Sequence, residues 1–464
     1  MPPATKPAFT CTECGWTTAK WVGRCPQCQA WGSVLEAGRP SSGPRTAAAQ
    51  VANPAVPIHE VDVETARALP TGVEEFDRVL GGGIVPGAVV LLAGEPGVGK
   101  STLLLDVAAR TAGTGSKVLY ITGEESASQV RLRAERINAL DDRLLLAAET
   151  DLATVLGQIE SQRPDLLVVD SVQTIASGEV DSSAGSVAQV REVATALIAV
   201  AKRTGTPVLL VGHVTKDGSI AGPRMLEHLV DVVCQFEGDK HAQLRMVRAI
   251  KNRYGPTEEV GCFSLSETGI HSLPDPSGLF LSPQRQGVPG TCVTVALDGR
   301  RPMPIEIQAL VARSPLPHAR RTTSGVDTSR LSMILAVLQA RLEVEITNYD
   351  VYVATVGGSR AAEPATDLAI ALAVVSARDD FEVRDTLVAI GEVGLAGELR
   401  PAIGTERRLS EARRLGFTHA IVPPARERIR TPAGMRVQEA PNLGEAVRLA
   451  RAPSGPVRHL TRVD

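Results

Sequence analysis

Short apolar runs alternate with segments of helical spacing between about residues 58 and 273 of this 464-residue chain. The first run, Ala88–Ala93, precedes a glycine-rich turn and then a segment whose apolar residues recur at the spacing of a helix face. A short amphipathic helix that ends in glycines is predicted before it, from Thr71. Strands that alternate with helices favour a parallel sheet flanked by helices. Further strands are predicted at 117–122, 166–170, 207–213, 242–250 and 261–265, the last two with an antiparallel option.

A second alternation of helices and strands follows toward the C-terminus. Residues 276–330 hold only short strand-like pieces, so we interpret them as a connecting segment, with a flexible join at 324–329. Residues 36–57 are rich in proline, alanine, serine and glycine without periodicity, which is typical of a flexible linker. The predicted fold class is α/β, with folded domains at 1–35, 58–275 and 331–464. In the last of these, helices are predicted at 331–342, 367–378 and 405–415, and strands at 351–356, 387–393 and 420–423.

Composition narrows the class of protein only slightly. Hydrophobic residues make up 43% of the chain, enough for proper cores, and aromatic residues make up 3%. The net charge of −3 gives no support for nucleic-acid binding, although a basic channel can lie on a neutral protein. The sequence shows neither a leader pattern nor an apolar run of the roughly 18 residues that a membrane span needs. We therefore expect a cytoplasmic protein without a membrane partner.

Four of the seven cysteines fall within the first 28 residues, in two CxxC pairs. Each pair can direct two thiolates at one ion, and two pairs complete a tetrahedral Zn²⁺ site. Redox-active or free thiols are the alternative, but a redox CxxC would begin a helix in a βαβ unit, which is missing here. We predict a C4 zinc ribbon at residues 1–35 whose metal supplies its folding energy. The predicted ligands are Cys11, Cys14, Cys25 and Cys28.

All three tryptophans, Trp16, Trp21 and Trp31, lie in or beside this ribbon. We predict that they pack its faces, with stacking on nucleic-acid bases as the alternative. The other three cysteines are scattered singly, and we expect them to be buried apolar residues.

The glycine-rich turn after Ala93 reads GEPGVGKS and matches the pattern GxxxxGK[ST] between a strand and a helix. Its glycines let successive N–H groups and the helix N-terminus face a polyphosphate. Lys100 adds a cation for the β- and γ-phosphates, and Ser101 offers a hydroxyl to Mg²⁺. A turn without a ligand is the alternative, but the complete motif predicts a nucleoside-triphosphate site. The predicted binding residues are Gly94, Glu95, Pro96, Gly97, Val98, Gly99, Lys100, Ser101 and Thr102.

Acidic and polar residues end the strands that follow. Asp170 ends a strand about 70 residues after the P-loop, and we predict that it holds Mg²⁺ rather than only capping a turn. Glu124 and Glu125 end the strand after the P-loop helix, where ligands of open α/β sheets gather. One of them is the candidate base that activates water, and position favours Glu124; capping of the next helix is the alternative. His213 ends another strand, either as a sensor of the γ-phosphate or as a plain polar strand end.

Several motifs together resemble the RadA (Sms) family of bacterial recombination proteins. They are TGxxEFDRVLGGGIVPG, GEPGVGKST, YITGEES, VVDSVQT and VGHVTKDGxIAGPRxLEHxVD. The resemblance extends from the CxxC pairs to the C-terminus. The family signature KNRFG is matched, with tyrosine for phenylalanine, by Lys251, Asn252, Arg253, Tyr254 and Gly255.

This resemblance implies a RecA-like P-loop ATPase core, similar also to DnaB-type helicases, that assembles as a homo-hexamer around DNA. It implies that Glu124 is the catalytic base and that His213 senses the γ-phosphate. Lys251 and Arg253 would act on the nucleotide of the neighbouring subunit, where a cation stabilises transition-state charge only once the ring is assembled. The loops that contact DNA would be 173–189 and 214–226, with Lys216 and Arg224 as phosphate contacts.

The C-terminal region resembles the proteolytic domain of Lon, which needs a nucleophilic serine and a lysine that activates it. In the matching places this chain has Ala365 and Glu406. Alanine carries no nucleophile, and the arginines that follow Glu406 cannot be deprotonated to act as a base, so we do not expect proteolysis. The domain would instead organise the ring and add a DNA surface. The candidates for that surface, or for a solvated helix face, are Arg407, Arg408, Arg413 and Arg414.

We therefore predict a DNA-dependent ATPase, a ring-helicase-type motor that uses ATP, Mg²⁺ and Zn²⁺. It would act on single-stranded and branched DNA and drive branch migration alongside the RecA recombinase during repair. We expect the small, tethered zinc ribbon to recruit that recombinase. The alternatives are a KaiC-like scaffold, whose nucleotide only sets the oligomeric state, and a Lon-type ATP-dependent protease.

Overall fold

The structure is a computed structural model, and it describes residues 9–36, 55–60, 67–213, 226–238, 243–282 and 288–451. The chain divides into two compact units, Met1–Asp62 and Val63–Asp464. Most of the predicted linker, 37–54, lies outside the described residues. Across the described ranges, none of the helices is both long and apolar enough to cross a membrane.

The N-terminal unit contains a three-stranded antiparallel sheet of order β2-β1-β3, formed by β1 (Phe9–Cys11), β2 (Thr17–Thr18) and β3 (Val34–Glu36). Its small core is built around two buried cysteines and a valine. Trp16 packs against that core, but Trp21 is 64% exposed and Trp31 is 77% exposed. The prediction that the tryptophans pack the faces of the ribbon is therefore wrong for two of the three, because a unit of this size has too little core to cover them.

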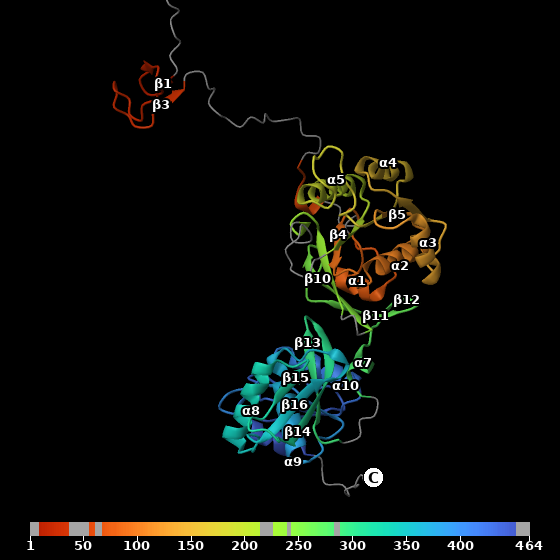
Figure 1. Cartoon of the computed structure of the whole chain (residues 1–464), viewed down its shortest axis with the longest axis vertical. Coiled ribbons are helices and arrows are strands. Elements are labelled where there is room, and N and C mark those ends of the chain that lie inside the picture. Colours follow the sequence, from red (N-terminus) through yellow and green to blue (C-terminus); the bar gives the residue numbers. More distant parts are fainter. Residues whose placement is uncertain are drawn as a thin grey trace, which may run out of the picture. The chain divides into compact units, whose positions relative to one another are not determined.

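The second unit begins with a nine-stranded sheet of order β12-β11-β10-β9-β4-β8-β7-β5-β6 (Figure 1). Neighbours from β9 through β6 pair in parallel, and β9 to β12 pair in antiparallel fashion. This confirms the predicted parallel sheet and its antiparallel extension. The strands are β4 (Val89–Gly94), β5 (Val118–Thr122), β6 (Leu144–Ala148), β7 (Leu166–Asp170), β8 (Val208–His213), β9 (Val232–Glu237), β10 (Leu244–Asn252), β11 (Val260–Ser266) and β12 (Gly269–Ser272).

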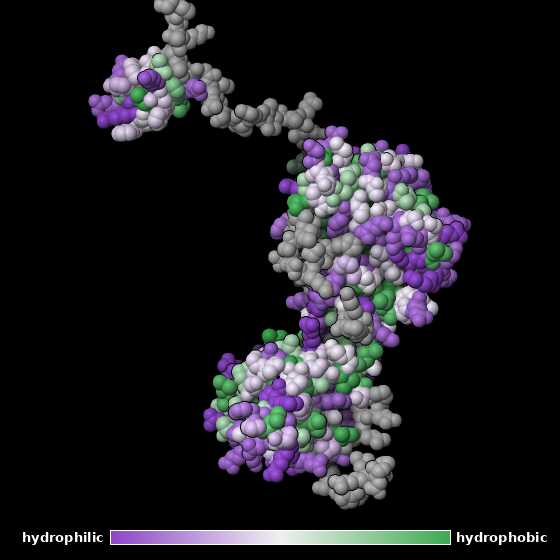
Figure 2. Space-filling view, viewed as in Figure 1, coloured by the Kyte–Doolittle hydropathy of each residue, from purple (hydrophilic) through white to green (hydrophobic). Residues whose placement is uncertain are grey.

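Successive side chains of the central strands enter two different cores. Val90 and Leu92 of β4 pack with the helices α1 (Glu74–Leu80), α2 (Lys100–Gly113) and α3 (Ala127–Arg136). Val89 and Leu91 pack on the opposite face with α4 (Leu152–Gln162) and α5 (Val187–Thr204). A strand buried on both faces reads as a continuous apolar run, which explains why these strands were recognisable in the sequence. On the face drawn in Figure 2, the surface over α3 is mainly hydrophilic.

A second sheet of seven strands, of order β15-β16-β14-β13-β17-β20-β21, follows in the chain. Its first strands lie within residues 276–330, so the prediction that this segment only connects two domains is wrong. The predicted flexible join at 324–329 is a tight connection in which Asp327 caps the next helix. The strands are β13 (Thr291–Asp298), β14 (Arg301–Arg313), β15 (Arg321–Ser324), β16 (Tyr349–Thr355), β17 (Leu387–Ala389), β20 (His419–Val422) and β21 (Arg436–Glu439), with the separate pair β18 (Glu392–Val393) and β19 (Leu399–Arg400).

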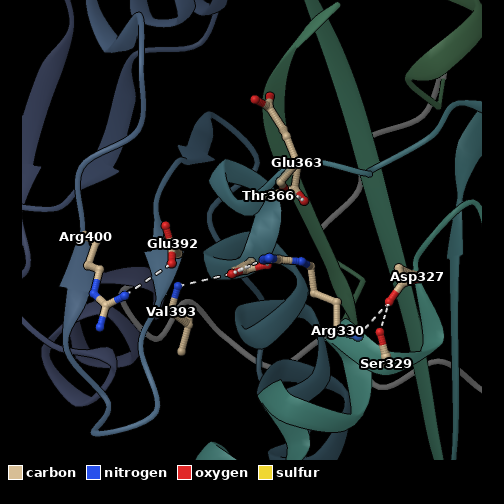
Figure 3. Close-up of polar contacts among 9 residues, drawn as sticks. Asp327, Ser329, Arg330, Glu363, Thr366, Glu392, Val393 and Arg400 are labelled. Carbon is tan, nitrogen blue, oxygen red and sulfur yellow. Dashed lines mark hydrogen bonds and ion pairs between the residues drawn. The ribbon is translucent and has the colours of Figure 1, made fainter.

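Helices cover both faces of this second sheet. One core contains α8 (Thr328–Leu342), α9 (Asp367–Asp379) and α11 (Leu443–Ala450), and the other contains α10 (Thr405–Arg414). Arg330 of α8 donates to both carboxylate oxygens of Asp367, at 2.9 and 2.8 Å, and thereby fixes α8 to the start of α9 (Figure 3). Burial raises the pKa of Asp367 to about 6, although Arg330 opposes the shift. The α/β class predicted from the sequence is confirmed for both sheets.

A buried arginine joins the two sheets. Arg301, the first residue of β14, pairs with Glu75 of α1, and these side chains are 6% and 1% exposed. Arg301 also donates to the carbonyls of Val260, Leu273 and Pro274, at 2.8, 3.3 and 2.7 Å. The N-terminal end of α1 is therefore held by the first strands of the C-terminal sheet.

Candidate nucleotide site and zinc ribbon

The P-loop connects the carboxyl end of β4 to the first turn of α2. A Cβ atom at Gly94 would lie 2.5 Å from the carbonyl oxygen of Phe236, so only glycine fits where β4 and β9 end side by side. Gly99 precedes the helix with φ of 112°, a conformation that other residues rarely adopt. The backbone thus opens the helix N-terminus toward the loop, which is the arrangement that binds phosphate.

Lys100 folds back over the loop. Its Nζ donates to the carbonyls of Gly94 and Glu95, both at 2.8 Å, and the residue is only 3% exposed. Burial lowers the pKa of Lys100 to about 8, and the charges of Asp170 and Glu124 oppose that shift. The cation and the two carboxylates are therefore close enough to interact electrostatically.

Asp170 is buried at the end of β7. The hydroxyl of Tyr120 donates to its Oδ2 at 2.7 Å, while Oδ1 is buried and has no hydrogen-bond partner. Burial raises the pKa of Asp170, and the nearby hydroxyls of Ser101 and Tyr120 oppose the shift. A buried carboxylate oxygen without a partner, beside the P-loop hydroxyl, fits the oxygen ligands that Mg²⁺ requires.

The two candidate bases have different surroundings. Glu124 is exposed and accepts a hydrogen bond from the hydroxyl of Ser171, the residue after Asp170. Glu125 forms an ion pair with Arg133 of α3, whose side chain is 18% exposed. Neither glutamate caps α3, because Ser126 does so through a capping box. Glu124 is therefore the exposed carboxylate of the two and lies beside Ser171, whereas Glu125 is engaged by Arg133.

Three other predicted residues cannot be placed as side chains. The backbone of His213 ends β8 and pairs in register with Gly94, but its side chain is not among those that the structure describes. Lys216 and Arg224, the predicted DNA contacts, lie outside the described residues.

The KNRYG segment crosses from β10 to the C-terminal end of α1. Asn252 donates from Nδ2 to the carbonyls of Val79 and Leu80, at 3.4 and 3.2 Å. A Cβ at Gly255 would lie 3.2 Å from the Cα of Gly81, so this glycine permits close contact with the turn after α1. Two residues of the motif therefore bind α1.

The two cations of the motif contact the segment that follows residues 214–225. Lys251 Nζ donates to the carbonyls of Glu227 and Val230, at 2.7 and 2.8 Å. Burial lowers the pKa of Lys251, and the nearby Arg253 lowers it further. Arg253 pairs with Asp231 at 3.2 Å, and Tyr254 is 40% exposed. Lys251 and Arg253 therefore lie at the surface but are held by the backbone and by one carboxylate.

The four N-terminal thiols converge. Their Sγ atoms all lie within 4.8 Å of one another, with 3.6 Å between Cys11 and Cys28 and between Cys14 and Cys25. A Zn–S bond of about 2.3 Å in a tetrahedron implies sulfur–sulfur separations of about 3.8 Å, so the four thiols fit one Zn²⁺. The other three cysteines are buried and unpaired, as predicted.

The region that resembles Lon has no nucleophile among its described residues at the expected place. Ala365 is 4% exposed and packs in a core, and Glu406 accepts from the backbone of Arg430. Arg408 is 1% exposed and forms an ion pair with Glu363, so the prediction that Arg408 faces DNA is wrong. Arg414 is held by Glu411 and Asp275. Of the four predicted arginines, Arg407 and Arg413 bond only to backbone carbonyls among the described residues.

Sequence reasoning missed the residues that support the site. Tyr120 and Ser171 hydrogen-bond to Asp170 and Glu124, Arg133 holds Glu125, and Asp231 holds Arg253. Ser171 adjoins Asp170 and could have been suspected. Tyr120 and Asp231 lie 50 and 22 positions from their partners, and Arg133 lies eight positions from Glu125, but no motif in the sequence identifies these pairs.

Matches to family models agree with this architecture. Family models match for the rubredoxin metal-binding domain at 9–36, for the AAA domain at 55–219 and for subunit ChlI of Mg-chelatase at 325–426. DNA repair protein RadA of Mycolicibacterium smegmatis is 53% identical, over 96% of each chain. The protein of the same name from Listeria monocytogenes is 43% identical, over 95% of this chain and 97% of that one. A KaiC-like protein of Pyrococcus horikoshii aligns with a TM-score of 0.39 and 21% identity, over 45% of this chain and all of that one.

Proposed function

The chain belongs to the RadA family of DNA repair proteins, and on that premise we propose that it is a cytoplasmic, DNA-dependent ATPase that remodels recombination intermediates. The observation that carries the proposal is the grouping of Lys100, Asp170 and Glu124 at the end of a parallel sheet. This grouping supports their roles as a phosphate-binding cation, a metal-binding carboxylate and a candidate base.

ATP and Mg²⁺ are the cofactors of this pocket. The P-loop amides and Lys100 bind the phosphates, while Ser101 and the free oxygen of Asp170 would hold Mg²⁺, which neutralises phosphate charge. Glu124 orients and deprotonates the attacking water, and the hydroxyl of Ser171 holds this carboxylate in place. His213 is proposed as the residue that senses the γ-phosphate.

The site is completed by a second copy of the chain. We propose a homo-hexameric ring in which Lys251 and Arg253 reach the nucleotide of the neighbouring subunit. Cations supplied in this way stabilise the charge of the transition state only in the assembled ring, which couples turnover to assembly. Ordered turnover around the ring would drive branch migration, with Lys216 and Arg224 as contacts to single-stranded or branched DNA.

The first test measures ATP turnover with and without single-stranded DNA for the wild type, Lys251→Ala and Arg253→Ala. We expect DNA to stimulate the wild type strongly, and both variants to lose turnover while they still bind nucleotide. No stimulation by any DNA would instead favour a KaiC-like scaffold. Lys251 also bonds to two backbone carbonyls, so Lys251→Ala removes contacts within the subunit as well as a cation. Arg253→Ala is therefore the more direct test of action between subunits.

The zinc ribbon is proposed to recruit the RecA recombinase. Zn²⁺ would hold its fold, and Trp21 and Trp31, which are 64% and 77% exposed, give it an aromatic surface. Deletion of residues 1–35 should abolish binding of the recombinase and spare basal ATP turnover. Unchanged binding after the deletion would contradict this role.

The C-terminal Lon-like domain is proposed to support the ring without peptidase activity. Ala365 offers no nucleophile, the expected lysine position is occupied by Glu406, and the buried Arg408 forms an ion pair with Glu363. A casein-degradation assay with ATP should therefore show no cleavage.

A further inference from the structure

A buried carboxylate lies directly behind the half-exposed Arg253. The side chain of Asp231 is 4% exposed, whereas that of Arg253 is 55% exposed. Arg253 Nη1 donates to Asp231 Oδ1 at 3.2 Å, and the backbone N–H of Arg253 donates to the carbonyl of Asp231 at 3.2 Å. The carboxylate thus anchors one side of the guanidinium while about half of the side chain stays open to solvent.

The same carboxylate is tied to the strand that leads into the P-loop. Val89, the first residue of β4, donates its N–H to Asp231 Oδ2 at 3.0 Å, and its carbonyl accepts the N–H of Asp231 at 3.0 Å. Lys202, in the last turn of α5, donates to the same Oδ2 at 2.6 Å. One carboxylate therefore connects two half-exposed cations to the strand of the chain's own nucleotide site.

From this geometry we infer that Asp231 is the positioning residue for Arg253. It holds the guanidinium in the orientation in which it meets the phosphates of the neighbouring subunit's nucleotide. The inference rests on the proposed function, because it requires Arg253 to act between subunits. It adds to that function the residue, Asp231, that holds the Arg253 guanidinium in position before it meets the phosphates.

The physical reason is pre-organisation. A free arginine side chain loses much rotamer freedom when it engages a phosphate, whereas an anchored one has already lost part of it. Lys202 and Arg253 share one carboxylate, so the cluster keeps a net positive charge and still attracts a polyphosphate. If the carboxylate paired with Arg253 alone, it would compete more strongly with the phosphate for the guanidinium.

The first variant is Asp231→Asn, which keeps an oxygen that can accept from Val89 but loses the charge that holds Arg253. We expect roughly a 10- to 100-fold fall in kcat with little change in KM, the size of loss that misplaced catalytic groups cause. The matched control is Glu237→Gln at the far end of β9, the strand that begins directly after Asp231; its carboxylate is 36% exposed and pairs with Arg248. We expect this control to turn over like the wild type, and equal losses in the two variants would overturn the inference.

Mixed rings of two variants can show whether Asp231→Asn impairs turnover in the neighbouring subunit or within its own subunit. Lys100→Ala lacks a working P-loop but keeps Asp231 and Arg253, so in a mixed ring it can serve the intact P-loop of an Asp231→Asn neighbour. We expect the mixture to turn over ATP faster than the sum of the two variants measured alone. The positive control is a mixture of Lys100→Ala with Arg253→Ala.

The outcomes distinguish the inference from the proposed function. A gain in the control mixture without a gain for Asp231→Asn would mean that Asp231 only supports its own strand, which overturns the inference. No gain in either mixture would overturn the action of Arg253 between subunits. The double variant Asp231→Asn/Arg253→Ala gives an independent check, because it should turn over no more slowly than Arg253→Ala alone. An additional loss in the double variant would contradict the inference.

Discussion

Replacement of Arg301 by methionine tests how firmly the two sheets are joined. The guanidinium is 6% exposed and pairs with Glu75, which is 1% exposed. Removal of one partner from a buried ion pair typically costs about 3–5 kcal/mol, because the other charge stays buried. Three backbone carbonyls also lose a donor, while Glu75 keeps Arg78 and the N–H of Cys262. We therefore expect a loss of about 4 kcal/mol, or a fall in Tm of roughly 10 °C.

The neighbouring Arg300 provides the matched control. It is 44% exposed, and its contacts with Glu258 and Glu259 measure 3.6 and 3.9 Å. Such a surface pair is worth about 0–1 kcal/mol, so Arg300→Met should melt within about 3 °C of the wild type. Melting should be followed by far-UV circular dichroism, because all three tryptophans lie in the N-terminal unit and do not report on this junction.

A second variant tests the electrostatic origin of the loss. Arg301→Met/Glu75→Gln leaves no uncompensated charge in the junction, and the introduced amide would keep an oxygen for the N–H of Cys262. The double variant should therefore be more stable than Arg301→Met alone. Equal Tm values for Arg300→Met and Arg301→Met, or a double variant less stable than the single one, would refute this reasoning.

Three further predictions follow from the nucleotide site and the ribbon. Glu124→Gln should lower kcat by about 10²- to 10⁴-fold with nucleotide binding retained, whereas Glu125→Gln should stay within a few-fold of the wild type; similar losses in both would contradict the assignment of the base. Bound phosphate raises the pKa of Lys100 from about 8, so Lys100 must take up a proton on binding at higher pH. Nucleotide affinity measured by calorimetry should thus fall above pH ~8, and Lys100→Arg should remove this dependence because guanidinium stays charged; an equal fall in that variant would exclude Lys100 as the cause. A zinc-selective chelator should change tryptophan fluorescence without altering basal ATP turnover, and constant fluorescence would argue against a structural metal.

The parts of the fold that the sequence predicted well are those with simple periodicity. Strands buried on both faces, such as β4 and β7, are continuous apolar runs, and their ends position Gly94 and Asp170. β14 was missed because Pro302 and Pro304 interrupt its alternation, and proline is unusual inside a strand. Its long antiparallel pairing with β13 overrides that local signal.

Residues that depend on distant partners could not be assigned from the sequence. The carboxylate of Asp231 bonds to Val89, 142 positions earlier, and Arg301 pairs with Glu75 across 226 positions. Both contacts form only when the sheets assemble, so no local spacing indicates them. The choice between Glu124 and Glu125 is a milder case: position already favoured Glu124, and the ion pair of Glu125 with Arg133 adds a structural reason.

Arg407 and Arg408 are adjacent in α10 but have very different surroundings. Arg407 is exposed and bonds to the carbonyl of Arg300, whereas Arg408 is buried and bonds to Glu363 and to the carbonyl of Val295. A helix turns by about 100° per residue, so neighbouring positions point to different faces and only one of them can meet the core. The charge of Arg408 is neutralised inside the domain and is unavailable to a nucleic acid. A DNA surface on α10 would therefore depend on Arg407 and Arg413 and on residues outside this helix, rather than on the number of arginines in its sequence.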